Sequence, residues 1–152
     1  MLPKWHILLG FIFSLLIWII FPSTGLLFFL AVFLSSFLVD VDHYVYYAFK
    51  CKDISLPNAY RSCLEQGKRW DALPQKEKNK YKITPLFLHG FEFWLLLIIA
   101  SFFNKIFFFI FLGVIFHMAI DLIALYKDRD PLYAKLSQIY VLATNKNKKE
   151  LR

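Results

Sequence analysis

The chain has 152 residues, of which 59% are hydrophobic and 20% aromatic, and its formal net charge is +7. Soluble domains contain roughly 45–50% apolar residues, so this composition argues against a soluble domain and predicts one all-α integral membrane domain. The basic residues lie beside apolar segments rather than in a stripe with base-stacking aromatics. We therefore expect membrane lipids with anionic headgroups as partners, and no nucleic acid.

The first apolar segment covers residues 5–21 and is interrupted only by His6 and Ser14. It is just long enough to cross a hydrocarbon core of about 30 Å. A signal peptide is the competing interpretation, but the segment is long for one and no A-x-A-like cleavage site follows, so we expect a retained span. His6, beside Trp5, is interpreted as an interfacial residue.

The second span is predicted over residues 26–49, after a turn that contains proline and glycine. Tyrosines near its end, followed by Lys50, are typical of the membrane interface. Residues 50–84 then form a polar, basic loop. A weakly amphipathic patch within it predicts a helix on the membrane surface, with Asn58 as its cap.

The third and fourth spans are predicted over residues 86–103 and 106–126, because one helix over both segments would be far too long for a single crossing. Asp130 and Pro131 resemble the cap and first residue of a short amphipathic helix over residues 132–142. The sequence therefore predicts four transmembrane helices, a basic loop and a short C-terminal helix.

Lysine and arginine gather in loop 50–84 and tail 127–152, whereas Lys105 is the one basic residue expected on the opposite side. By the positive-inside rule, both termini and the long loop lie in the cytoplasm, beneath a plasma or inner membrane. The reducing cytosol would keep Cys51 and Cys63 as thiols.

Ionisable residues interrupt three of the four predicted spans, where such residues are rare and usually functional. They occur as histidine–carboxylate pairs three or four residues apart, a spacing that places both side chains on one face of a helix. The pairs are Asp40/His43 with the adjacent Asp42, His89/Glu92, and His117/Asp121.

The depth of these residues in the membrane can be counted at about 1.5 Å per residue from the outer ends of the predicted helices. Counting from residues 26, 103 and 106 places all six paired residues between about 17 and 26 Å. They share one layer on the cytoplasmic side of the membrane.

Neutral imidazoles and ionised carboxylates are metal ligands, and a divalent cation would offset the cost of several buried negative charges. Mixed nitrogen and oxygen ligation favours Zn²⁺, with Mn²⁺ or Fe²⁺ as alternatives. Seven candidates exceed one tetrahedral shell. Either the extra carboxylates orient the histidines, or two metals bind. Glu92, with its longer side chain, is the candidate general base.

Several features also allow interpretations without a metal. Asp42 and His43 could mark a helix end at the interface, and His89 could be interfacial. A histidine–aspartate hydrogen-bond network could simply hold the helices together. Gly90 and Gly113 are interpreted as positions where helices approach closely.

Three short motifs carry a resemblance to a known family: D-V-D-H at 40–43, L-F-L-H-G-F-E-F at 86–93 and H-M-A-I-D at 117–121. The chain resembles the small integral-membrane metal-dependent hydrolases of the LexA-binding inner-membrane type. Members commonly have a proline before the first aspartate, where this chain has Val39. They also have an H-R-x-x-T-H-S-like segment, where this chain has Gly90-Phe91-Glu92 after His89. The resemblance implies metal-dependent hydrolase activity.

The sequence thus favours metal-assisted hydrolysis of a lipid-like ester or phosphoester at the cytoplasmic interface. Asp40, Asp42, His43, His89, His117 and Asp121 would bind or orient the metal. Basic residues near the same end, Lys50, Lys82, Lys127 and Arg129, would set topology and could attract an anionic headgroup. A membrane scaffold with a structural polar or metal cluster is the alternative, and transport is disfavoured because the outer half of each span is almost wholly apolar.

Overall fold

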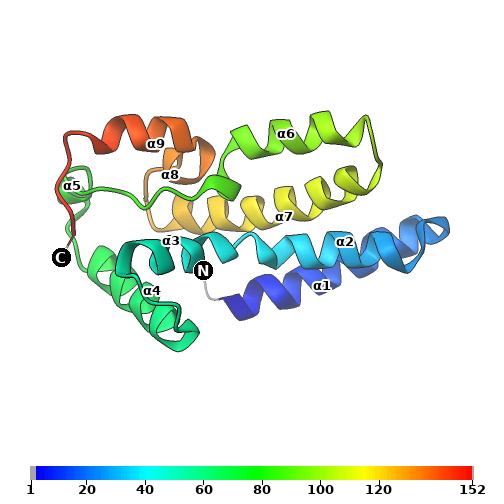
Figure 1. The fold of residues 1–152 in the computed structure, drawn as a ribbon, viewed down its shortest axis with the longest axis horizontal. Coiled ribbons are helices and arrows are strands. Elements are labelled where there is room, and N and C mark those ends of the chain that lie inside the picture. Colours follow the sequence, from blue (N-terminus) through cyan, green and yellow to red (C-terminus); the bar gives the residue numbers. More distant parts are fainter. Residues whose placement is uncertain (1–2, 152) are drawn as a thin grey trace.

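The protein is described by a computed structural model covering residues 3–151, and it is helical throughout (Figure 1). Between residues 3 and 151 the β-structure consists of one isolated bridge between Tyr81 and Lys149. The all-α prediction is confirmed. The helices are α1 (Pro3–Ile20), α2 (Gly25–Leu38), α3 (Val41–Cys51), α4 (Leu56–Asp71), α5 (Gln75–Lys78), α6 (Phe91–Ser101), α7 (Ile106–Lys127), α8 (Tyr133–Leu136) and α9 (Gln138–Asn145), with 3₁₀ turns η1 (Pro22–Thr24) and η2 (Phe87–His89).

Four apolar helices, α1, α2, α6 and α7, extend along the long axis of the molecule (Figure 1). Helix α7 is central to the packing and contacts α1, α2 and α6. The buried core lies where these helices meet and consists of Val39, Leu97, Val114 and Met118. The remaining helices gather at the end opposite the turns that join α1 to α2 and α6 to α7.

Gly113 lets α7 approach α2 closely, as the sequence predicts. A Cβ atom at this position would collide with the carbonyl oxygen of Val32 and the hydroxyl of Ser35. Gly10 has the same role between α1 and α2, because a Cβ there would collide with Ser36. The absence of side chains at these two positions brings three helices close enough to share one polar site.

One helix of the described chain, α7, is long and apolar enough to cross a membrane by itself. Its 22 residues rise by about 33 Å, which matches the hydrocarbon core. Helices α1 and α2 pass the same test only as a pair, bent by 98° where they join, and α6 is shorter. The helical architecture is therefore established, whereas four separate spans remain a prediction.

The predicted continuous helix over residues 26–49 is wrong, because α2 ends at Leu38 and α3 begins at Val41. Tight hydrogen bonds mark the break, with Asp42 N–H donating to the carbonyl of Val39 at 3.2 Å. The predicted helix over residues 86–103 also starts differently. It opens with the 3₁₀ turn η2 and Gly90 in extended backbone, and only then continues as α6.

The polar loop contains α4, whose cap differs from the predicted one. The Ser55 hydroxyl, rather than Asn58, caps the helix and accepts a hydrogen bond from the Asn58 N–H at 3.5 Å. At the other end of α4, the Trp70 indole donates to Asp130 at 3.0 Å. Lys78 pairs with the same carboxylate at 2.6 Å, which ties the loop to the end of α7.

The predicted C-terminal helix over residues 132–142 is divided into α8 and α9 by Ser137, which has extended backbone angles. Asp130 does not cap α8, because its carboxylate binds Trp70 and Lys78. The Ser137 hydroxyl instead caps α9 through the N–H of Tyr140. The break lets the segment fold back over the polar end of the long helices.

Candidate metal centre

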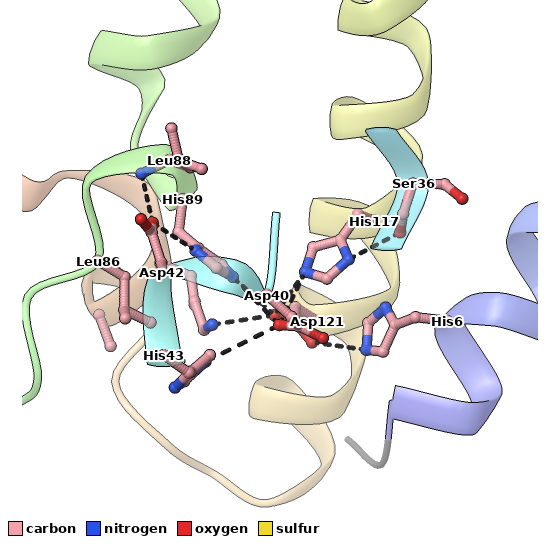
Figure 2. Close-up of polar contacts among 12 residues, drawn as sticks. His6, Ser36, Asp40, Asp42, His43, Leu86, Leu88, His89, His117 and Asp121 are labelled. Atoms are coloured by element: carbon pink, nitrogen blue, oxygen red, sulfur yellow. Dashed lines mark hydrogen bonds and ion pairs between the residues drawn. The ribbon is translucent and has the colours of Figure 1, made fainter. Parts of the chain in front are cut away.

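The carboxylates of Asp40 and Asp121 lie at the centre of a polar cluster between the helices (Figure 2). All four histidines of the chain surround them. His6 comes from α1, His43 from α3, His89 from η2 and His117 from α7. Every predicted pair thus contributes a histidine or an aspartate to this cluster.

Four atoms form the innermost group: Nε2 of His89 and His117 and one oxygen each from Asp40 and Asp121. His117 Nε2 lies 3.6 Å from Asp40 Oδ1 and 3.5 Å from Asp121 Oδ2. His89 Nε2 lies 3.6 Å and 3.9 Å from the same two oxygens. Both histidine side chains are fully buried. We call these four residues the central group.

The backbone of α2 determines which nitrogen of His117 faces the centre. His117 Nδ1 lies 2.9 Å from the carbonyl oxygen of Ser36. A carbonyl can only accept a hydrogen bond, so Nδ1 carries the proton. In the neutral ring, Nε2 then presents a lone pair to the central group.

Asp42 orients His89 in the same way. Its Oδ2 accepts a hydrogen bond from Leu88 N–H at 2.5 Å and lies 3.3 Å from His89 Nδ1. The carboxylate therefore receives the Nδ1 proton and leaves the Nε2 lone pair directed inward. Metal-binding histidines almost always donate their second nitrogen to a carboxylate or carbonyl, as both rings do here.

The two inward Nε2 atoms are buried and have no hydrogen-bond partner among residues 3–151. Buried polar atoms without partners are rare, so this pair needs an explanation. Distances of 3.5–3.9 Å to the carboxylates are too long for hydrogen bonds. They are close to the ~3.3 Å that separates neighbouring ligand atoms in a tetrahedral site with bonds of ~2.0 Å. The spacing therefore suits a metal ion, and three overlapping sets could hold one: His89, His117 and Asp121; Asp40, His43 and His89; and His6, Asp40 and His117.

His6 is part of the cluster and not an interfacial residue, so that prediction is wrong. Its Nε2 lies 3.3 Å from Asp121 Oδ1, the oxygen that faces away from His117. Its ring also packs on that of His117, with centroids 4.2 Å apart. Counting depth from the outer helix end, as for the other three spans, could have placed His6 in this layer. His6 lies about 21 Å from the end of α1 at Ile20, at ~1.5 Å per residue.

Lys135 is the second residue that the sequence analysis missed. Its ammonium group lies 3.1 Å from Asp121 Oδ2, and the side chain is largely buried. The folded-back segment that contains α8 brings this charge to the cluster. Neither periodicity nor spacing relates Lys135 to Asp121, so the sequence carried no signal for this contact.

Glu92 does not reach the central group, and its prediction as general base is wrong. Its carboxylate accepts hydrogen bonds from the Ser137 hydroxyl at 2.7 Å and from the N–H groups of Gln138 and Ile139 at 3.2 and 3.1 Å. These are free donors at the start of α9. Because Gly90 interrupts the helix between His89 and Glu92, the two side chains do not share a helical face.

His43 lies at the edge of the cluster. Its Nε2 is 3.9 Å from Asp40 Oδ1, and 39% of its side chain is exposed. The ring meets that of His89 edge to face, with centroids 5.6 Å apart. His43 is therefore the histidine that connects the buried centre to solvent.

The predicted basic residues lie outside the central group. Lys50 and Lys82 pair with Glu150, at 4.0 and 3.5 Å. Lys127 ends α7, and Arg129 follows in the left-handed conformation with φ of 55°. Lys135 is thus the basic side chain that the described structure places in contact with the cluster.

The chain matches no protein-family model, and no curated protein or solved structure is significantly similar to it. The functional argument consequently depends on the cluster itself.

Proposed function

We propose that the protein is a membrane-embedded, metal-dependent hydrolase that acts on a lipid-like ester or phosphoester at the cytoplasmic interface. One observation carries the proposal: two buried imidazole nitrogens, with their protons directed elsewhere, face two carboxylates at 3.5–3.9 Å. The partial resemblance of the three motifs to integral-membrane metal-dependent hydrolases supports the same function. In this proposal α1, α2 and α6 are embedded in the membrane beside α7, as four spans.

Zinc is the metal that we propose. Two imidazoles and two carboxylates form a mixed nitrogen and oxygen set that suits Zn²⁺, and a catalytic ion would take three of these ligands and leave the fourth position to water. Octahedral ions such as Mg²⁺ use mainly oxygen ligands. The bound ion would supply Lewis-acid polarisation of the substrate and activation of water.

The surrounding residues have distinct roles in this proposal. Asp42 and the Ser36 carbonyl orient His89 and His117. His6 contacts Oδ1 of Asp121 and so fixes the orientation of this carboxylate. His43, at the exposed edge, carries protons between the centre and solvent, which replaces the role first predicted for Glu92.

Hydrolysis can be tested with the purified full-length protein and chromogenic esters and phosphodiesters that carry a long alkyl chain. We expect turnover that depends on added Zn²⁺ and is lost in the His117→Ala variant. The His43→Gln variant should keep its zinc and lose most of the turnover. Stoichiometric zinc without turnover on either substrate class would contradict the enzymatic proposal.

A structural role is the second candidate, and the contact of Lys135 with Asp121 favours it. An ammonium group beside this carboxylate neutralises part of the buried charge, so the cluster could hold the helices together without a metal. In that case Lys135→Met would destabilise the protein severely, and chelators would have no effect on its stability. In the metal-centre proposal, zinc protects the Lys135→Met variant against unfolding.

The proposed topology can be tested with the two native cysteines, since both lie in the loop assigned to the cytoplasm. Cys51 is exposed, and burial raises the pKa of the partly buried Cys63 thiol. A membrane-impermeant maleimide should label Cys51 in inverted vesicles and fail to label it in intact cells. Labelling in intact cells would contradict the proposed orientation.

A further inference from the structure

An apolar groove of about 460 Å³ lies between α2, α6 and α7. Its walls include Leu27 and Leu34 of α2, Phe93 of α6, and Ile106 and Ile110 of α7. The one hydroxyl side chain in the lining belongs to Ser35, which already donates to the carbonyl of Ala31 at 2.6 Å. The groove therefore offers no free polar group along its length.

One end of the groove lies beside the candidate metal centre. Val39 and Leu88 line this end, and they directly precede Asp40 and His89 in the chain. Leu27 and Ile106 line the other end, near the turns far from the cluster. The groove thus leads from the polar cluster toward the opposite end of the long helices.

The length and chemistry of the groove fit a single hydrocarbon chain. From Leu27 to Val39, α2 rises by about 18 Å, comparable with the ~15 Å of one bilayer leaflet. One wall belongs to α7, the helix that is long and apolar enough to span a membrane, so in the proposed topology hydrocarbon surrounds the groove. Polar recognition is confined to the end where the aspartates, histidines and Lys135 lie.

We propose that this groove is the acyl-chain site of the substrate, with the ester or phosphoester group at the central group and the chain extending toward Leu27. This inference deepens the proposed function and rests on it. The substrate class is a lipid with an unbranched chain of leaflet length and an anionic head, for which Lys135 provides the nearest positive charge. A bound metal would add to that attraction.

The probe for this site is hexadecyl phosphate with a photoreactive diazirine at the chain end. The full-length protein is kept in a sterol-based detergent, which has no flexible alkyl chain to fill the groove. We expect crosslinks at Leu27, Leu30 and Ile106. Unlabelled hexadecyl phosphate should displace the probe, whereas hexyl phosphate should not, because its chain is too short to reach Leu27.

Groove-filling variants make the test specific. Ala31→Trp and Leu34→Trp both place an indole in the groove and should reduce crosslinking by about tenfold or more. Ala119→Trp is the matched control, because Ala119 is exposed on α7 outside the groove, and it should crosslink like the wild type. Crosslinks spread over the exposed faces of α1 and α6, unchanged in both groove variants, would overturn the proposal.

Zinc content measured on the same samples separates this proposal from the hydrolase proposal. If the groove variants lose crosslinking but keep wild-type levels of zinc, the result supports both the acyl-chain site and the hydrolase proposal. Specific crosslinking in a protein that binds no zinc would support the acyl-chain site and contradict the metal-dependent function. Zinc binding without specific crosslinking would contradict the acyl-chain site alone.

Discussion

His6 Nε2 lies 3.3 Å from Asp121 Oδ1, and this contact joins α1 to α7. Asp121 thereby uses one oxygen toward His6, while the other faces His117 at 3.5 Å. Lys135 contacts this second oxygen as well, at 3.1 Å, so both oxygens of the carboxylate are held in place. His6 is thus a positioning residue whose removal tests how firmly Asp121 must be held.

The His6→Phe variant keeps an aromatic ring beside His117 and removes both imidazole nitrogens, including the Nε2 that meets Asp121. We expect the free energy of unfolding to fall by about 1–3 kcal/mol, because a buried carboxylate oxygen loses its partner. Zinc affinity should fall roughly 10–100-fold. Denaturant unfolding and zinc titration measure the two effects, and Trp5→Phe provides the control for a change at the same turn. Unchanged zinc affinity would show that His6 has no part in the site.

Asp42→Asn tests the orientation of His89. The amide oxygen can still accept the hydrogen bond from Leu88, but the negative charge that favours the correct His89 tautomer is lost. We predict that zinc affinity decreases roughly 10–100-fold while the helical content measured by circular dichroism stays the same. The Asp42→Ala variant should bind zinc more weakly still, since the N–H of Leu88 is then left without its acceptor.

Glu92→Ala distinguishes the observed cap from the predicted catalytic base. The variant removes the acceptor for free N–H groups at the start of α9, so we expect a loss of stability of about 1 kcal/mol. Turnover per bound zinc should remain within a few-fold of the wild type. A loss of turnover of a hundredfold or more, with zinc content and stability intact, would restore Glu92 as the base.

Asp53 gives the loop a predictable dependence on pH. The hydroxyl of Tyr47 donates to its Oδ2 at 2.5 Å and the N–H of Ser55 to its Oδ1 at 2.9 Å, and these bonds hold the pKa of Asp53 below its ordinary value of 3.8. Because the folded pKa is lower than the unfolded one, this stabilisation is fully present above the unfolded pKa. It is lost as the pH falls through the folded pKa.

We therefore expect the Asp53→Asn variant to melt at a lower temperature than the wild type at neutral pH, with a gap that narrows as the pH falls below about 4. Melting curves at a series of pH values measure this gap. The Asp71→Asn variant, at the other end of α4, is the control. A gap that widens as the pH falls would contradict the assignment.

Much of the fold and part of the site could be predicted because hydropathy and helix geometry act locally. The long apolar segments determined α1, α2 and α7, and counting at ~1.5 Å per residue placed Asp40, His89, His117 and Asp121 at one level. The structure brings these four together. Their convergence could be expected because a shared depth is a property of each helix considered alone.

The features that the sequence analysis missed have different causes. Lys135 reaches Asp121 only because the tail folds back over the bundle. Glu92 leaves the cluster because Gly90 breaks the helix that its spacing assumed. His6 was assigned to the interface from its neighbour Trp5, although its depth matched that of the other histidines. Tertiary packing thus explains the Lys135 contact alone, whereas the break at Gly90 and the depth of His6 are local features of their own segments.

The first proposal, on which the others rest, is that the cluster of His89, His117, Asp40 and Asp121 holds one divalent cation. Its most direct test is the metal content of the purified full-length protein, measured beside the His117→Ala and Asp40→Asn variants. We expect one zinc ion per wild-type chain and almost none in either variant, with Ala119→Trp retaining the wild-type value. Wild-type protein that binds no zinc, and whose thermal stability is the same with and without a chelator, would contradict it.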